Sequence, residues 1–413
     1  MKYGLIGEHL CHSFSREIHD SIGEYSYELL ELAPEGVEGF LKSREFCAIN
    51  VTIPYKEMVI AELDWVSPEV KNIGACNTII NKDGRLFGYN TDYSGMKAML
   101  QRASIEICGR KVLVLGTGGT SRTAVALVKN LGATEVKRAS RRNGDESDVI
   151  CYDSLASEYS DIQVIINTTP CGMFPKTEFT PVDLKIFDRL EGVADVIYNP
   201  LRSRLLQDAA ARGLKTVGGL YMLVAQAVFA NALFMNHEVS NILIDRIFNE
   251  LLAVKENICL IGMPSCGKTT VGEALADKLG RPFFDSDRCI AEKAGMPAAD
   301  YIRRNSIAAF RQIEKETLAE LAKKDGCVIA TGGGAVLDGE NVRNLKQKGR
   351  LFFLDVSLCN LNPTSDRPLS KDIAALEALY NERYPIYCGA CDTKLDGNGT
   401  CAEVVERINK LLK

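Results

Sequence analysis

Ile258-Cys259-Leu260-Ile261-Gly262-Met263-Pro264-Ser265-Cys266-Gly267-Lys268-Thr269 is a short apolar strand, a glycine-rich turn and the start of a helical pattern. A turn with this spacing holds nucleotide phosphates on its backbone N–H groups, its lysine reaches the β- and γ-phosphate oxygens, and its hydroxyl can bind Mg²⁺. The stretch therefore predicts an α/β domain that binds a nucleoside triphosphate, and it leaves the phosphate acceptor open. The predicted phosphate-binding residues are Gly262, Ser265, Cys266, Gly267, Lys268, Thr269 and Thr270.

Strand-like and helical patterns alternate on both sides of this turn. Residues 1–95 alternate in this way, residues 111–115 open a new strand bounded by glycine, and residues 221–253 follow a helical pattern. Such alternation predicts α/β domains with mainly parallel sheets. We expect three parts, formed by residues 1–95 together with 221–253, by residues 96–220, and by residues 257–413.

The composition is that of a globular protein, with 413 residues of which 46% are hydrophobic and 25% charged. A net charge of −5 without a block of like charges argues against a nucleic-acid partner. No apolar stretch reaches the roughly 18 residues that span a bilayer, so no membrane association is expected. The 14 cysteines are scattered over a long chain, which favours reduced thiols and a cytoplasmic location.

A second glycine-rich turn follows the strand at residues 111–115 and precedes another helical pattern. Glycine lets the backbone approach a pyrophosphate, and a helix N-terminus favours its negative charge. Gly116, Gly118 and Gly119 are therefore candidate contacts to a dinucleotide cofactor. Because Ser121 replaces the third glycine of the usual pattern, a purely structural turn is the alternative.

The residues after the next expected strand indicate which dinucleotide would bind. NAD-binding domains carry an acidic residue about 20 positions beyond the glycines, against the ribose hydroxyl. Here a basic cluster, Lys137-Arg138-Ala139-Ser140-Arg141-Arg142, stands instead, and its last three residues are the candidate cofactor contacts. Such a cluster suits a 2′-phosphate, so the sequence favours NADP over NAD, with a solvated basic turn as the alternative.

Several motifs, in order along the first half, resemble those of shikimate dehydrogenases. They are His12-Ser13-Phe14-Ser15, Asn50-Val51-Thr52-Ile53-Pro54-Tyr55-Lys56, Gly74-Ala75-Cys76-Asn77-Thr78, Gly88-Tyr89-Asn90-Thr91-Asp92 and Met222-Leu223-Val224-Ala225-Gln226. The resemblance implies an N-terminal α/β substrate domain, formed by residues 1–95 with 221–253, and a Rossmann-like NADP domain over residues 96–220. The sequence departs from the family at Arg16, where proline is usual.

Reduction of a ketone needs a hydride and a proton donor for the oxygen. Lys56 follows a strand and Asp92 opens a helix, so the pair could place an ammonium at the developing alkoxide; the resemblance gives both the catalytic role. It also implies that Ser13 and Ser15 hold the substrate carboxylate. Further substrate contacts implied are Asn50, Thr52, Asn77, Asp92, Tyr198 and Gln226, and further cofactor contacts are Thr168 and Gly219.

The motifs beyond residue 280 resemble those of shikimate kinases. They are Asp285-Ser286-Asp287, Phe310-Arg311-Gln312-Ile313-Glu314, Thr331-Gly332-Gly333-Gly334, Arg367-Pro368-Leu369 and Glu382-Arg383-Tyr384-Pro385-Ile386-Tyr387. The resemblance implies a P-loop kinase domain of the nucleoside monophosphate kinase type over residues 257–413.

That resemblance also implies roles in the kinase site. Asp287 would contact or deprotonate the acceptor hydroxyl, Arg311 and Arg383 would clamp its carboxylate, and Arg367 would neutralise the transferring phosphoryl group. The backbone of Gly332, Gly333 and Gly334 would approach the ring, while Asp285 would join Thr269 at Mg²⁺. These kinases usually carry an arginine against adenine about two turns before the lid arginine; here Asn360 falls near that place in a stretch several residues short, which places tight ATP binding in doubt.

The two resemblances together predict an enzyme with two consecutive activities. The first half would reduce 3-dehydroshikimate with NADPH, and the second would phosphorylate the resulting shikimate with ATP and Mg²⁺. The expected partners are these small molecules, with neither nucleic acid nor membrane. One alternative is a dehydrogenase that acts on quinate or shikimate with NAD, and another is a non-catalytic nucleotide-sensing module in the second half.

Overall fold

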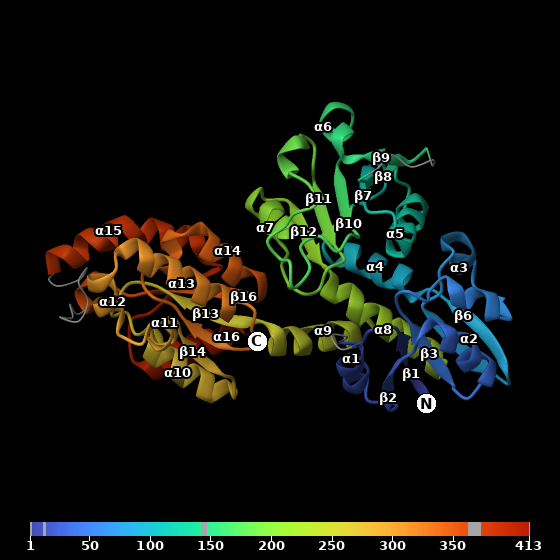
Figure 1. Cartoon of the computed structure of the whole chain (residues 1–413), viewed down its shortest axis with the longest axis horizontal. Coiled ribbons are helices and arrows are strands. Elements are labelled where there is room, and N and C mark those ends of the chain that lie inside the picture. The colour runs from blue at the N-terminus through green and yellow to red at the C-terminus, as the bar shows by residue number, and fades with distance from the viewer. Residues whose placement is uncertain (1, 11–13, 142–146, 362–372, 413) are drawn as a thin grey trace. The chain divides into compact units, whose positions relative to one another are not determined.

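The computed structural model describes residues 2–10, 14–141, 147–361 and 373–412 (Figure 1). The chain forms two compact units, Met1–Leu251 and Leu252–Lys413. Among the described residues the strands form three sheets, two in the first unit and one in the second. Ser13, Arg142 and Arg367 lie outside the described residues.

The first sheet has the order β2-β1-β3-β5-β6-β4 and mixes parallel and antiparallel pairs. β1 is parallel to β2 and β3, whereas the β5–β6 hairpin is antiparallel to β3. Its strands are β1 (Tyr3–Gly7), β2 (Tyr27–Glu31), β3 (Ala48–Val51), β4 (Trp65–Val66), β5 (Thr78–Lys82) and β6 (Arg85–Tyr89). The helices between them are α1 (Ser15–Ile22), α2 (Pro34–Ser43), η1 (Met58–Glu62) and α3 (Pro68–Ile73).

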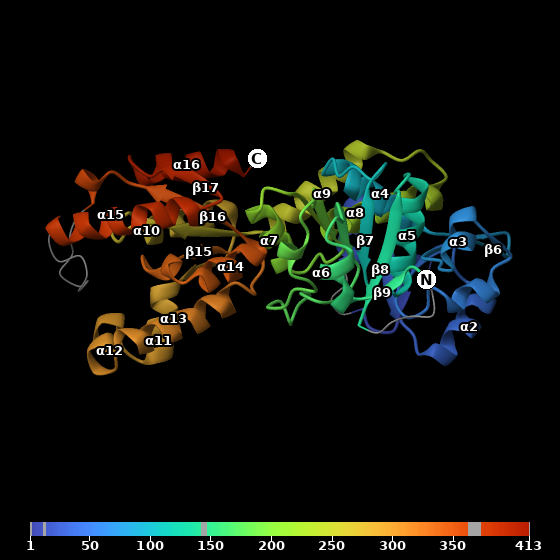
Figure 2. The same cartoon turned by 90° about the horizontal axis from the view of Figure 1, so that it is seen from above.

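The second sheet is parallel and has the order β12-β11-β10-β7-β8-β9. Seen from above, α5 lies against the β7–β8 part of this sheet (Figure 2). The strands are β7 (Lys111–Leu115), β8 (Glu135–Ser140), β9 (Val149–Cys151), β10 (Val164–Asn167), β11 (Gly192–Asp195) and β12 (Lys215–Gly218). The helices are α5 (Gly119–Asn130), η2 (Tyr152–Ser154), α6 (Leu155–Glu158), η3 (Leu184–Ile186) and α7 (Arg204–Ala211).

Helices α4 (Thr91–Arg102) and α8 (Gly219–Met235) pack closely against each other in the first unit (Figure 1). A side chain at Gly95 would lie 2.7 Å from the carbonyl oxygen of Met222, so the contact requires glycine. Because α8 is apolar around most of its surface, it is largely buried. This packing brings Asp92, in the first turn of α4, close to Gln226 on α8. Helix α9 (Asn241–Lys255) follows α8.

The third sheet is also parallel and has the order β14-β15-β13-β16-β17, with the phosphate-loop strand β13 in its centre. Buried apolar side chains of these strands form the core of the second unit. The strands are β13 (Asn257–Ile261), β14 (Phe283–Asp285), β15 (Val328–Ala330), β16 (Gly349–Asp355) and β17 (Thr393–Asp396). The helices are α10 (Lys268–Leu279), α11 (Ser286–Ala294), α12 (Ala298–Arg304), α13 (Ile307–Leu321), η4 (Ala335–Leu337), α14 (Gly339–Lys348), η5 (Leu358–Asn360), α15 (Ile373–Ala390) and α16 (Cys401–Leu411).

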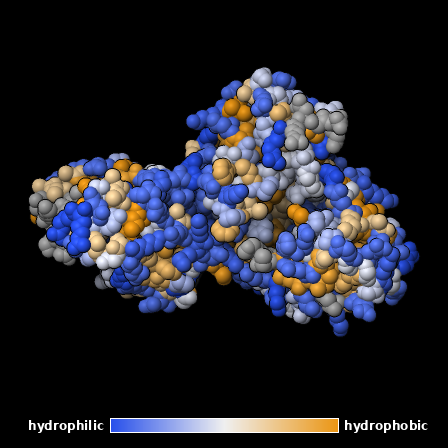
Figure 3. Space-filling view, in the orientation of Figure 1, coloured by the Kyte–Doolittle hydropathy of each residue, from blue (hydrophilic) through white to orange (hydrophobic). Residues whose placement is uncertain are grey.

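The predicted α/β fold with mainly parallel sheets is confirmed. In the part of the chain that the structure describes, no helix is long and apolar enough to span a bilayer. On the face shown in Figure 3, hydrophobic side chains occur in small groups among hydrophilic ones.

Candidate active sites

A lysine–aspartate pair lies in the first unit. Lys56 follows β3, and Asp92 lies in the first turn of α4, whose N-terminus is capped by the Asn90 side chain. The Lys56 Nζ atom is 2.6 Å from Asp92 Oδ2, and the two side chains are only 20% and 13% exposed. The pair therefore holds an ammonium group at a fixed point with limited access to water.

A cavity of about 290 Å³ surrounds this pair. Most of the predicted substrate contacts line it, although they come from the first sheet, α1, α4, α8 and the loop after β11. The predicted residues along its wall are Ser15, Asn50, Thr52, Lys56, Asn77, Asp92, Tyr198 and Gln226. Arg16, where the sequence departs from the family pattern, is exposed, and its Nε atom lies 3.8 Å from Asp20 Oδ2.

The side-chain amides of Asn50 and Asn77 offer the cavity different groups, an acceptor from Asn50 and a donor from Asn77. The Oδ1 atom of Asn50 accepts from the Tyr27 hydroxyl at 2.7 Å, and its Nδ2 atom donates to the Asn77 carbonyl and to Thr78 Oγ1. Both N–H groups of Asn50 are thus engaged, and only its oxygen has capacity left. In contrast, Asn77 Oδ1 accepts from the Thr91 backbone N–H and Asn77 Nδ2 donates to Thr91 Oγ1, so among the described residues its second N–H has no partner and can donate.

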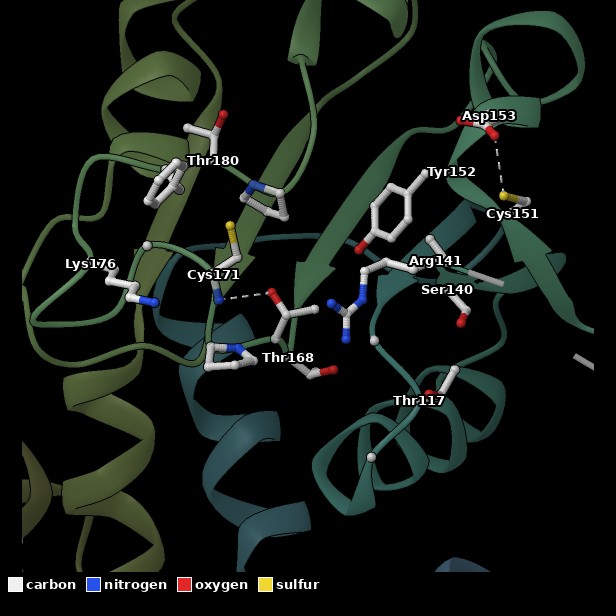
Figure 4. A pocket seen from close by; sticks show the side chains of 18 residues that line it. Thr117, Ser140, Arg141, Cys151, Tyr152, Asp153, Thr168, Cys171, Lys176 and Thr180 are labelled. Atoms are coloured by element: carbon white, nitrogen blue, oxygen red, sulfur yellow. Dashed lines mark hydrogen bonds between the residues drawn. The ribbon is translucent and has the colours of Figure 1, made fainter. Parts of the chain in front are cut away.

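A larger cavity of about 830 Å³ lies at the carboxyl ends of the strands of the second sheet. Ligands of parallel α/β sheets bind at this edge. A side chain at Gly116 would lie 3.0 Å from Thr168 Oγ1, so the backbone there leaves a space that only glycine keeps open. Figure 4 shows the Arg141 guanidinium turned into the cavity near the Tyr152 ring. The predicted cofactor residues that line it are Gly116, Gly118, Ser140, Arg141 and Thr168.

The other predicted cofactor residues of this unit have different positions. Gly119 is the first residue of α5, and Gly219 lines a smaller cavity beside Lys56 and Asp92. Arg138, within the basic cluster, is buried and forms a two-point ion pair with Asp148, at 2.9 and 2.8 Å. That arginine therefore supports the β8–β9 region and is not available to a phosphate.

Sequence reasoning missed part of the large cavity. Tyr152 follows β9, while Cys171 and Lys176 lie in the loop after β10. Burial raises the pKa of Tyr152 to about 12, so its hydroxyl is neutral at pH 7. These residues belong to no glycine or charge pattern, and their place beside the glycine turn follows only from the sheet order.

The glycine-rich turn of the second unit leads from β13 into α10. Gly262 has φ +151° and Gly267 has φ +86°, conformations that residues with a side chain rarely adopt. Lys268 is buried, and its Nζ atom donates to the carbonyl oxygens of Gly262 at 3.0 Å and Met263 at 2.8 Å. The turn is thus closed around a buried ammonium group. The remaining predicted members, Ser265, Cys266, Thr269 and Thr270, lie within this turn or in the first residues of α10.

Thr269 and Asp285 meet beside the turn. The Thr269 hydroxyl donates to Asp285 Oδ2 at 2.6 Å, while Asp285 Oδ1 accepts from the backbone N–H groups of Asp287 and Arg288. Among the described residues, no group of three or more His, Cys, Asp or Glu side chains could hold a metal by itself. The pair therefore offers two oxygen ligands and depends on other ligands to complete a metal site.

Three residues predicted to bind the phosphate-accepting substrate, Asp287, Arg311 and Arg383, lie around the glycine run at 332–334. A side chain at Gly332 would lie 2.6 Å from Asp287 Oδ1, and one at Gly334 would collide with the Arg311 guanidinium. Arg383, on α15, donates to the Gly333 carbonyl at 3.0 Å. The run has little room for side chains, because Asp287, Pro264 and Arg311 each approach one of its three glycines.

Two further residues of this region were not predicted. Glu314 is paired with Arg311 one helical turn earlier, and its burial raises its pKa above the ordinary glutamate value. The Tyr387 hydroxyl donates to the same carbonyl of Gly333 as Arg383. Both residues lie within or beside motifs quoted above, but their contacts depend on how α13 and α15 pack.

Asn360, which falls near the position predicted for the missing arginine, bonds to a neighbouring loop. Its Nδ2 atom donates to Asn398 Oδ1 at 2.8 Å, and the same oxygen accepts from the backbone N–H of Ser357. Asn360 thus joins η5 to the loop after β17 and does not offer a planar cation to a base.

The two units define a nucleotide-dependent oxidoreductase joined to a P-loop phosphotransferase. The family model of the shikimate dehydrogenase substrate binding domain matches residues 5–79, and the shikimate kinase model matches residues 264–413. A shikimate dehydrogenase (NADP(+)) of Clostridium perfringens is 37% identical over 268 residues, which are 60% of this chain and 97% of that protein. The chain belongs to the shikimate dehydrogenase family and carries a shikimate kinase domain.

Solved structures show the same similarity for the first unit. Shikimate dehydrogenase 1 of Peptoclostridium difficile is 36% identical, with a TM-score of 0.56 over 61% of this chain and 98% of that chain. A chorismate mutase/shikimate 5-dehydrogenase fusion protein from Clostridium acetobutylicum is 37% identical, with a TM-score of 0.58 over 60% of this chain and 96% of that one. The shikimate 5-dehydrogenase of Thermus thermophilus, in complex with NADP(H) and shikimate, is 30% identical, with a TM-score of 0.55 over 60% of this chain and 99% of that one.

Proposed function

We propose that the first unit reduces 3-dehydroshikimate with NADPH and that the second phosphorylates the resulting shikimate at its 3-hydroxyl with ATP. The observation that supports this most directly is the lysine–aspartate pair in a cavity lined by residues suited to a polyol acid. In the second unit, the buried lysine of the phosphate loop supports the kinase reaction. Both activities follow from the families to which the units belong.

In the dehydrogenase step the chain supplies the proton and the orientation. NADPH, when bound in the large cavity, supplies the hydride. Lys56 Nζ would donate to the ketone oxygen as negative charge develops there, and Asp92 would keep the lysine in place. Ser13 and Ser15 would hold the carboxylate. The ring hydroxyls would meet the acceptor of Asn50, the donor of Asn77, and the side chains of Thr52, Tyr198 and Gln226.

Two features of the cofactor cavity suit NADP, namely its glycine turn and the positive charge of Arg141. The Gly116 position lies where a side chain would fill the space beside Thr168. Arg141, turned into the cavity, would face the 2′-phosphate, together with Ser140 and Arg142. This arrangement favours NADP over NAD, and so over the alternative of a degradative quinate enzyme. Gly118 and Gly119 would face the pyrophosphate at the start of α5, and Gly219 would lie toward the nicotinamide.

We expect Arg141→Ala to raise the KM for NADPH about ten- to a hundredfold, because a hydrogen bond to a charged group is lost. The contact is made equally in the ground and transition states, so kcat should change little. The KM for NADH should stay the same, since NADH lacks the 2′-phosphate. Steady-state kinetics with both cofactors checks this, and equal use of NADPH and NADH by the parent protein would refute the proposed preference.

In the kinase step, Asp287 would accept the proton of the attacking hydroxyl, and Arg311 and Arg383 would bind the carboxylate. Arg383 is buried, and its Nε atom has no hydrogen-bond partner among the described residues. A buried guanidinium N–H without a partner is costly, and a bound carboxylate would satisfy it. Arg367 would act on the transferring phosphoryl group.

Thr269 and Asp285 would hold Mg²⁺ together with phosphate oxygens and water. Mg²⁺ prefers hard oxygen ligands and usually keeps several waters, which fits a site with two protein oxygens. When bound, Mg²⁺ neutralises charge on the phosphates. These contacts also favour a working kinase over a nucleotide-sensing module. We also propose a cytoplasmic location, because cysteines scattered over so long a chain are typical of proteins from a reducing compartment.

Removal of divalent cations should separate the two activities. An excess of EDTA is expected to abolish formation of shikimate 3-phosphate and to leave NADPH oxidation by 3-dehydroshikimate unchanged, because only the kinase site uses a metal. Added Mg²⁺ should restore the kinase. Kinase activity that persists in EDTA would contradict the role of Thr269 and Asp285.

A single coupled assay tests the whole proposal. The protein is incubated with 3-dehydroshikimate, NADPH, ATP and Mg²⁺, and shikimate 3-phosphate is measured. Omission of NADPH should prevent the product unless shikimate is added, and omission of ATP should let shikimate accumulate. Absence of product from shikimate and ATP in a folded protein would instead support a nucleotide-sensing second unit.

A further inference from the structure

A buried tyrosine lies behind the substrate cavity of the first unit and does not line it. Tyr27, on β2, is 1% exposed, and its hydroxyl donates to Asn50 Oδ1 at 2.7 Å. Burial raises the pKa of Tyr27 well above the ordinary tyrosine value, so the hydroxyl keeps its proton. The phenol is therefore a permanent donor to the amide of a residue that does line the cavity.

An amide group has two orientations that differ only by exchange of its oxygen and nitrogen. For Asn50, the donor Tyr27 on one side and the acceptors Asn77 O and Thr78 Oγ1 on the other all require the same orientation. With both N–H groups engaged, the only group that Asn50 can offer the cavity is its oxygen.

Tyr27 is itself held by a stacked histidine. The His19 ring lies 3.8 Å from the Tyr27 ring at an interplanar angle of 11°, and its Nδ1 atom is 2.7 Å from the Tyr25 hydroxyl. Burial lowers the pKa of His19 to about 3, so the ring is neutral. His19 and Ser15 are four residues apart on α1, which places them on one face of the helix.

We propose that Tyr27 is a positioning residue of the dehydrogenase site, which fixes the Asn50 amide so that it accepts a hydrogen bond from one ring hydroxyl of the substrate. This inference rests on the proposed dehydrogenase function and adds a determinant of its specificity. Stacking on His19 ties the same tyrosine to the helix that carries Ser15. Tyr27 thus contacts the residues that carry two sides of the cavity, directly at Asn50 and through His19 at the helix of Ser15.

The test compares Tyr27→Phe with Tyr3→Phe, because each variant loses one hydroxyl from the same aromatic cluster, and Tyr3 stacks on Tyr25 while the hydroxyl that bonds to Asn50 is that of Tyr27. Tyr27→Phe should raise the KM and the calorimetric Kd for shikimate about three- to tenfold, the effect of one neutral hydrogen bond. Its kcat should stay within about twofold of the parent value because the contact is made equally in the ground and transition states. Tyr3→Phe should leave both constants within about twofold of the parent values.

Analogues of shikimate that each lack one ring hydroxyl give a second readout. In the parent, loss of the hydroxyl that donates to Asn50 should weaken binding, and in Tyr27→Phe the same loss should cost much less. A tyrosine that only stabilised the fold would not change the penalty for a single hydroxyl. Thr78→Val, which removes an acceptor on the other side of the Asn50 amide, should also raise the Kd and serves if Tyr27→Phe does not fold.

Equal constants for Tyr27→Phe and Tyr3→Phe, or unchanged hydroxyl penalties, would overturn the inference. Its failure is distinguishable from failure of the proposed function. A parent protein that reduces 3-dehydroshikimate while Tyr27→Phe behaves like the parent contradicts only the role of Tyr27. If the parent had no reductase activity, the proposed function would fail, and the binding measurements with shikimate would still decide the role of Tyr27.

Discussion

Lys56→Ala should lower kcat/KM for the reduction of 3-dehydroshikimate about 10²- to 10⁴-fold, the usual contribution of a positioned proton donor. Lys56 Nζ is held 2.6 Å from Asp92 Oδ2, and both side chains are largely shielded from solvent. Alanine leaves the developing alkoxide without a donor, and water in the vacated space is not fixed in position. The rate of NADPH oxidation, followed by absorbance, measures the loss.

The control for this variant is another lysine of the same unit. Lys71 lies exposed on α3, outside the cavity, so Lys71→Ala should retain the parental reductase rate. Phosphorylation of added shikimate should be unchanged in both variants, because each set of motif residues lies within its own unit. If Lys56→Ala silenced the kinase as well in a folded protein, the two activities would depend on each other beyond their covalent link.

Much of both sites could be predicted because their residues stand at strand ends and helix starts. Lys56 follows β3, Asp92 opens α4, and Gly116 and Gly262 each follow a buried parallel strand. Carboxyl ends of parallel strands meet at one edge of a sheet, so local patterns already indicate which side chains converge. The joint order of motifs added the substrate class, which no single residue carries.

Other features depend on contacts between distant segments and have no local signal. Tyr152 reaches the cofactor cavity only because β9 lies at the edge next to β8. Arg138 belongs to a basic cluster in the sequence, yet its pair with Asp148 removes it from the phosphate-binding set. Tyr27, more than 20 residues before Asn50, reveals its role only through the pairing of β1 with both β2 and β3.

The two glycine turns show why similar sequences serve different chemistry. In each, a glycine with positive φ follows a central parallel strand, and a helix begins a few residues later. Only the second turn contains a lysine, and that lysine is buried against the carbonyl oxygens of the turn itself. The first turn therefore can bind a phosphate that stays intact, while the second can also stabilise charge on a phosphoryl group in transfer.

Lys268→Ala should accordingly reduce phosphorylation of shikimate about 10²- to 10³-fold, the cost of removing a donor aimed at transition-state charge. Its ammonium now donates to Gly262 O and Met263 O, and it must turn from them to reach phosphate oxygens when ATP binds. Reduction of 3-dehydroshikimate should continue at the parental rate. Release of ADP, measured with saturating shikimate and Mg²⁺, gives the kinase rate.

Lys278→Ala provides the matched control, since Lys278 lies on the same helix α10 but pairs with Glu406 at the surface. Exposed pairs contribute roughly 0–1 kcal/mol, so this variant should keep both its fold and its kinase activity. Lys268→Arg should recover little, because a planar guanidinium cannot occupy the space of a compact ammonium between two carbonyl oxygens. A Lys268→Ala protein that phosphorylates shikimate as fast as Lys278→Ala would show that the buried lysine supports only the turn and takes no part in transfer.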